Sequence, residues 1–156
     1  MNTDQLLKIP FTWVNRIKIL ELLPHKTNVR FALFCAHQVK HLVELEQQEV
    51  CLKAIEVAEL FLVGKVTKEE CRKAADAANA AAFYASSAAA YAASYAAYAA
   101  SYAASYAAHV AYAAHVAYAS NNQETIKQEQ MDYLRDLIIV ELPEEEKSCW
   151  LLVAAL

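Results

Sequence analysis

The chain has 156 residues, of which 58% are hydrophobic, and this is enough for one domain with a buried core. Its formal net charge is -4, from 14 Lys and Arg against 18 Asp and Glu, so it offers no basic field for a phosphate backbone. We therefore expect a single domain over residues 1–156 and no nucleic-acid partner.

Turn-forming residues are scarce in this chain. It contains one glycine and three prolines, too few for a many-stranded sheet with its turns, so we predict an all-α fold. The first apolar segment, Phe11 to Leu23, follows Pro10 and ends before Pro24, which predicts an N-terminal helix within residues 1–24.

A pair of helices is predicted over residues 27–63. Thr27 or Asn28 can cap the first of them, whose apolar positions follow helical spacing at Val29, Leu33, Ala36, Val39 and Val43. The polar stretch 46–49 is expected to bend or break the chain. A further helix then carries Ile55, Ala58 and Leu62 on one face.

The only glycine, Gly64, suits a helix C-terminus, and Thr67-Lys68-Glu69-Glu70 spells a capping box for a new helix. From Lys68 the sequence runs without Gly or Pro to Asn121-Asn122. One unbroken helix of this length would measure about 80 Å, against a radius of gyration of about 15 Å for a compact chain of this size. The sequence thus predicts a compact or elongated helical bundle around a long Ala/Tyr-rich segment, 67–120, with a break expected near Ser86-Ser87 if the bundle is compact.

The C-terminal region, 123–156, is predicted to hold two helices. Gln123 to Val140 is amphipathic and is interpreted as a lid helix. Pro143 begins a last segment, Glu144 to Leu156, with three glutamates in its first turn, as the helix dipole favours.

Tyrosines line one side of the predicted central segment. At about 100° per residue they fall with His109 in a stripe roughly 80° wide, bordered by serines. We select as candidate binding residues Tyr91, Tyr95, Tyr98, Tyr102, Tyr106, His109, Ser94, Ser101 and Ser105. Two interpretations stay open: a packing seam against Phe31, Phe34 and Leu42, or a groove for a partner helix or an aromatic ligand such as a nucleobase.

Catalytic and metal-binding motifs are not found. His37 and His41 are four residues apart, but position 38 is Gln where a zinc protease has Glu, so exposed helix-face histidines are expected. His109 and His115 do not converge on one helix side. There is no P-loop, dinucleotide motif or nucleophile motif, so we expect no enzyme, no catalytic residue, no metal and no cofactor.

The four cysteines, Cys35, Cys51, Cys71 and Cys149, are far apart and form no CxxC pair. The N-terminus MNTDQLLKIP lacks the pattern of a signal peptide, so we expect mostly buried thiols in a reducing cytoplasm. No charged residue lies between Asp76 and Glu124, but alanine gains little on entering lipid, so no membrane span is expected.

Several stretches resemble the fifth family of bacterial immunity proteins, which is alanine-rich and all-helical and also occurs in phage-like genomes. The resemblance covers roughly residues 29–119 and is carried by Arg30, Cys35-Ala36, Val39, Lys53 to Ala58, Gly64, Thr67 to Glu70, Lys73 to Ala75 and Ala108-His109-Val110. It implies a non-enzymatic protein of the immunity or counter-defence type that neutralises a cognate toxin or effector by occupancy, in the cytoplasm of a bacterium or a phage-infected host.

Two alternatives stay open beside this role. One is a module that sequesters a small nucleotide-like signal between tyrosines, and the other is a structural helical assembly. The long tyrosine and alanine surface exceeds what one small globule can cover, which predicts a homo-oligomer.

Overall fold

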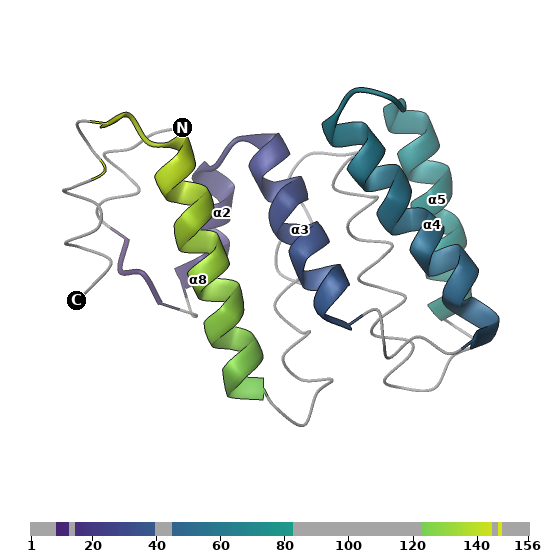
Figure 1. The fold of residues 1–156 in the computed structure, drawn as a ribbon, viewed down its shortest axis with the longest axis horizontal. Helices are drawn as coiled ribbons and strands as arrows, with labels where there is room; N and C mark the ends of the chain where they lie inside the picture. Colours follow the sequence, from purple (N-terminus) through teal and green to yellow (C-terminus); the bar gives the residue numbers. More distant parts are fainter. Residues whose placement is uncertain (1–8, 13–14, 40–44, 83–122, 145–146, 148–156) are drawn as a thin grey trace.

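The computed structural model describes residues 9–12, 15–39, 45–82, 123–144 and 147 of the chain. These residues form no strand and five helices: α2 (Arg16–Leu22), α3 (His25–Val39), α4 (Leu45–Leu62), α5 (Lys68–Ala82) and α8 (Gln123–Glu141). The predicted all-α fold class is confirmed. Figure 1 shows α8, α3, α4 and α5 following one another across the longest axis of the molecule.

Only the first part of the predicted Ala/Tyr-rich segment is described, as α5. Residues 83–122, with the break expected at Ser86-Ser87, lie outside the described residues, as does most of the last predicted helix, 144–156. The compact and elongated arrangements of that segment both stay predictions.

The N-terminal helix begins later than the sequence predicts. Instead of starting at Phe11, α2 starts at Arg16, because a turn precedes it. The backbone N–H of Thr12 and the side-chain amide of Asn15 both donate to the carbonyl oxygen of Pro10, at 2.9 and 3.0 Å. Phe11 therefore lies before the helix, and its ring contacts Arg135 of α8.

The predicted cap of the next helix is wrong. Helix α3 starts at His25, directly after Pro24, whose carbonyl oxygen accepts the backbone N–H groups of Thr27 and Asn28 at 3.0 and 3.1 Å. Thr27 and Asn28 thus lie inside the first turn. The Thr27 side chain is fully buried, and its hydroxyl donates to a carboxylate oxygen of Glu141 on α8.

The bend predicted at residues 46–49 is also wrong, because these residues form part of the first turns of α4. Glutamate and glutamine have high helix propensity, and acidic residues suit a helix N-terminus. Farther along, Ile55 and Ala58 are buried and Leu62 packs partly buried against the core, as their spacing predicts.

The turn between α4 and α5 follows the predicted chemistry. Gly64 has φ of 73°, its N–H donates to the Phe61 carbonyl at 3.0 Å, and the N–H of Lys65 donates to the Leu60 carbonyl at 2.9 Å. This is the hydrogen-bond pair of a Schellman motif, in which glycine takes the left-handed conformation without strain from a side chain.

The capping box that starts α5 is confirmed. The Thr67 backbone N–H donates to the Glu70 carboxylate at 2.7 Å, and the Glu70 N–H donates back to the Thr67 hydroxyl at 3.3 Å. The Thr67 hydroxyl also donates to that carboxylate at 2.8 Å. Two backbone donors that a helix start leaves without intrahelical partners are thereby satisfied.

Small side chains fill the seam between α4 and α5. These helices are neighbours in contact, and both bury residues spaced three and four apart. The buried small residues are Cys51, Ala54 and Ala58 on α4 and Cys71, Ala75 and Ala78 on α5. Because such side chains are short, the two helix axes can approach closely.

Helices α3 and α8 pack antiparallel along their length (Figure 1). Residue numbers rise along α3 as those of their partners fall along α8: Thr27 contacts Glu141, the Phe34 ring stacks on Tyr133 with centroids 4.1 Å apart, and Gln38 contacts Gln130. On α8, Leu134 and Ile138 are fully buried. The predicted helix is therefore present, but it is a core helix and not only a lid.

Replacing Leu134 by alanine should lower the free energy of unfolding by about 2–5 kcal/mol, because the side chain is fully buried in the core. Val140 on the same helix is 71% exposed, so Val140→Ala is the matched control and should change it by less than about 0.5 kcal/mol. Urea unfolding followed by circular dichroism measures both. Equal effects of the two substitutions would contradict the position of α8 in the core.

The hydrogen bonds from the Thr67 backbone and then from its hydroxyl lower the pKa of the exposed Glu70 carboxyl. A lowered folded-state pKa means that this contribution to stability is present above the unfolded-state pKa and is lost as the pH falls through the folded-state value. Carbon-detected NMR titration should give a Glu70 midpoint below that of the unfolded chain. Thr67→Ala removes the hydroxyl, with its methyl group, but keeps the backbone donor, and it should move the midpoint part of the way back. An unchanged midpoint would contradict the capping role of the hydroxyl.

Candidate functional site

The tyrosine face predicted from the sequence lies outside the described residues. This holds for every candidate binding residue selected there: Tyr91, Tyr95, Tyr98, Tyr102, Tyr106, His109, Ser94, Ser101 and Ser105. Phe34 was expected to pack against this face. The structure describes a different contact, in which Phe34 stacks on Tyr133 of α8 at an interplanar angle of 12°. The face stays a prediction.

Histidine 37 is exposed, and its Nε2 lies 2.9 Å from a Glu59 carboxylate oxygen on α4. His41, with which it was considered as a metal pair, lies outside the described residues. Within the described ranges, no group of three or more His, Cys, Asp or Glu side chains is arranged to hold a metal ion.

Three cysteine thiols, those of Cys35, Cys51 and Cys71, are free and buried, as the sequence predicts, while Cys149 is not described. Burial raises the pKa of Cys51 from 9.0 to about 11. Burial, with a smaller effect of the Glu70 carboxylate, also raises the pKa of Cys71. Because the thiolate is the nucleophilic form, these two side chains suit a core better than a reactive site.

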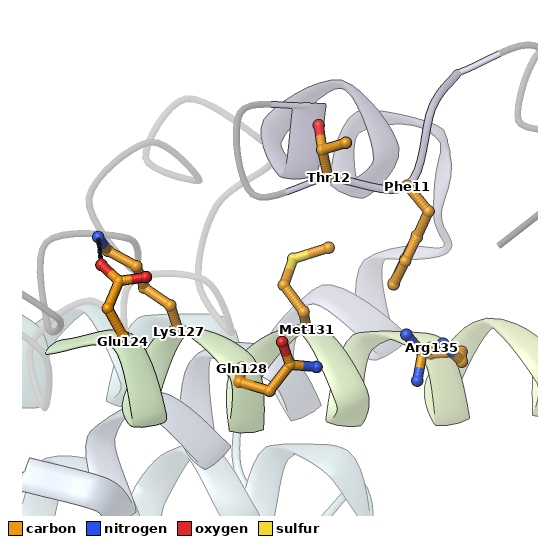
Figure 2. A pocket seen from close by; sticks show the side chains of 7 residues that line it. All are labelled: Phe11, Thr12, Glu124, Lys127, Gln128, Met131 and Arg135. Carbon is orange, nitrogen blue, oxygen red and sulfur yellow. Dashed lines mark hydrogen bonds and ion pairs between the residues drawn. The ribbon is translucent and has the colours of Figure 1, made fainter. Parts of the chain in front are cut away.

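A pocket lies between the N-terminal segment and α8 (Figure 2). Its volume is about 250 Å³. Phe11 and Thr12 form one wall. The opposite wall is a single side of α8, with residues spaced three and four apart: Glu124, Lys127, Gln128, Met131 and Arg135.

The cationic side chains of the pocket are held in place by neighbours. A guanidinium nitrogen of Arg135 lies 2.8 Å from Asp132, and the guanidinium carbon lies 5.3 Å from the centre of the Phe11 ring, which is cation–π distance. The Lys127 ammonium lies 2.7 Å from a carboxylate oxygen of Glu124. The pocket therefore combines two ion-paired cations with the apolar surfaces of Phe11 and Met131.

Sequence reasoning missed this pocket because it assigned Phe11 to a helix and treated α8 as a lid. One signal was present: the residues at 124, 127, 128, 131 and 135 share one helix side, although charge pairs three residues apart usually indicate only a solvated face. The second wall could not be found in the same way, since it requires the turn after Pro10 to bring a distant segment onto α8.

The helices and this pocket define an all-α protein with a small site that combines apolar side chains and ion pairs. The chain belongs to the Imm-5 like putative immunity protein family, which matches residues 18–137. The match runs from α2 into α8, confirms the family resemblance found in the sequence, and assigns the chain an immunity-type function. Neither a curated protein nor a solved structure matches the chain.

Phe11 and Thr12 precede the matched residues, whereas the α8 wall of the pocket lies inside them. Among the residues that the structure describes, no helix is long and apolar enough to cross a membrane.

Cys51 should react slowly with iodoacetamide in the folded chain. A rise in pKa from 9.0 to about 11 lowers the thiolate fraction near neutral pH about a hundredfold, and burial restricts access further. Alkylation at each cysteine, followed by mass spectrometry, should therefore be at least about a hundredfold slower at Cys51 in buffer than in the urea-unfolded chain. Similar rates in the two states would contradict the buried position of this thiol.

Proposed function

We propose that this protein neutralises a cognate toxin by binding it in a defined stoichiometry, without chemical turnover. The observation that carries the proposal is the match of residues 18–137 to a family of immunity proteins. Such a protein acts by covering a surface of the toxin. Its affinity therefore depends on shape complementarity and on a few anchoring side chains.

The described chemistry is compatible with action by binding. The thiols of Cys51 and Cys71 have raised pKa values and pack in the seam between α4 and α5. Several exposed charges on α4, α5 and α8 form pairs three residues apart, such as Lys53 with Glu56 and Arg72 with Glu69. Exposed pairs of this kind contribute less than about 1 kcal/mol to stability, so the surface can change charge partners on binding at little cost.

For the main contact surface we propose the tyrosine face, from Tyr91 to His109 with the bordering serines. Tyrosine supplies a large, rigid apolar area and a hydroxyl, and it is enriched among residues that dominate binding energy. The same face could serve the alternative role, in which it sequesters a nucleotide-like signal by stacking. Because this surface is longer than one small globule can cover, we also propose that the chain, as one domain over residues 1–156, self-associates.

Titration of a candidate toxin, taken from the genes next to this one, tests the proposal. The expected result is protection that saturates at a fixed molar ratio, with the toxin recovered chemically intact after the complex is denatured. Protection by a substoichiometric amount of protein, with cleaved or modified toxin, would overturn it. Stabilisation in a thermal-shift assay by nucleotides, with no binding of the toxin, would support the alternative.

Tyr98→Ala with Tyr102→Ala should weaken the toxin complex at least about tenfold if these side chains anchor it, since truncating an anchoring residue costs about 2 kcal/mol or more. Circular dichroism and the melting temperature should stay unchanged, because alanine favours helix. Tyr118→Ala is the control, since residue 118 falls on the opposite side of the predicted helix. A lowered melting temperature with unchanged affinity would mean that the tyrosines form a packing seam.

A further inference from the structure

The pocket between the N-terminal segment and α8 has a chemical character that indicates what it can bind. Its volume of about 250 Å³ lies below the range of roughly 300–1,000 Å³ common for small-molecule and cofactor sites. A space of this size fits one side chain of a partner better than a whole cofactor.

Arg135 is the most informative residue of the pocket. One guanidinium nitrogen, Nη1, contacts Asp132, and the guanidinium carbon lies over the Phe11 ring. Within the part of the chain that the structure describes, Nε and Nη2 have no hydrogen-bond acceptor, and the side chain is 33% exposed. Arginine presents its N–H donors as a rigid fork that matches a carboxylate, so Arg135 retains donors suited to a second acid.

The positions of Phe11 and Asp132 fix this guanidinium before any partner arrives. The cation–π contact with the Phe11 ring and the pairing with Asp132 restrict its rotamers, so binding would lose little side-chain entropy. Met131 is 7% exposed and points from α8 toward Thr12 across the pocket (Figure 2). Its thioether and the Phe11 ring supply an adaptable apolar contact next to the cation.

We propose that this pocket binds an acidic side chain of the protein partner, with the carboxylate on Arg135 and an adjoining apolar group against Phe11 and Met131. The proposal rests on the proposed function in one respect, namely that the partner is a toxin. The charge of the chain as a whole, -4, does not attract acids, so the selectivity for a carboxylate is local to this site. Lys127 lies on the same side of α8, but its charge is balanced by Glu124, so Arg135 is the residue that carries the selectivity.

Two acetylated dipeptide amides, Ac-Leu-Glu-NH₂ and Ac-Leu-Gln-NH₂, probe the pocket on the full chain by NMR. The glutamate peptide should shift the backbone amides of Phe11 and Met131 with millimolar affinity, and the glutamine peptide should bind about tenfold more weakly, because it lacks the charge-assisted pair. Equal affinities of the two peptides would overturn the proposal. N-acetylleucine, a free carboxylate, should bind more weakly than the glutamate peptide; tighter binding would assign the site to a small acid and overturn the protein partner.

Arg135→Gln should weaken binding of the glutamate peptide about tenfold and leave the glutamine peptide unchanged. Arg72→Gln is the matched control, because Arg72 also pairs with an acid three residues earlier but lies on α5, outside the pocket. An equal loss in both variants, or none in either, would overturn the proposal. Arg135→Lys keeps the charge but not the fork and should fall between wild type and Arg135→Gln, which provides a second variant if Arg135→Gln does not fold.

Binding of the toxin separates this inference from the proposed function. Arg135→Gln should raise the Kd of the toxin complex about tenfold relative to Arg72→Gln, with stoichiometry unchanged. If the wild-type chain binds the toxin and Arg135→Gln binds it equally well, the assignment of the pocket to the toxin fails while the proposed function stands. If the wild-type chain binds no toxin, the proposed function fails, and the peptide pair still decides whether the pocket selects a carboxylate.

Discussion

The antiparallel seam between α3 and α8 joins residues that are 91 to 114 positions apart in the chain, and it holds α8 against the earlier helices. Its middle is apolar and aromatic, with Leu134 buried and Phe34 stacked on Tyr133. Its two ends are polar. At one end the Glu141 carboxylate accepts from Thr27 and lies 3.6 Å from Arg30, and this cluster fixes which residues of the two helices face each other.

The opposite end of the seam is held by amides. Gln130 is fully buried and donates to Gln38 at 3.0 Å, and Gln38 donates to Glu129 at 2.7 Å. The Oε1 atom of Gln130 has no hydrogen-bond partner in the described structure, which costs about 1–3 kcal/mol for a buried acceptor. A sliding of α8 by one turn would separate both polar clusters at once, so they specify the register more than they add to stability.

The turn between α4 and α5 was predicted correctly, because its signals act locally. The cap of α3 was predicted wrongly, because a distant contact decides the role of its threonine. Gly64 and Thr67 act on atoms within five residues, so their roles are written in the adjacent sequence. Thr27 has the same capping chemistry, but its hydroxyl is bound by Glu141 on another helix. Its role could not be predicted without knowing that α8 packs on α3.

The candidate binding surfaces also differ in how far the sequence could predict them. The tyrosine face was selected from periodicity alone and lies outside the described residues, so its role stays a prediction. The pocket at Arg135 was not foreseen, because one wall depends on the Pro10 turn and the other on the placement of α8. Residues 18–137 carry the family match, and Phe11 lies before it, so the family pattern alone could not have indicated this pocket either.

The long separation across the α3–α8 seam has a consequence for the order in which the chain folds. The α4–α5 hairpin closes through a turn of a few residues, so its loop-closure entropy is small and it can form while the chain is still being synthesised. The seam cannot form until α8 has been made, and its contacts contribute high contact order, which slows folding. Until then the apolar side of α3 lacks its partner, and the nascent chain depends on the early hairpin to limit exposed core surface.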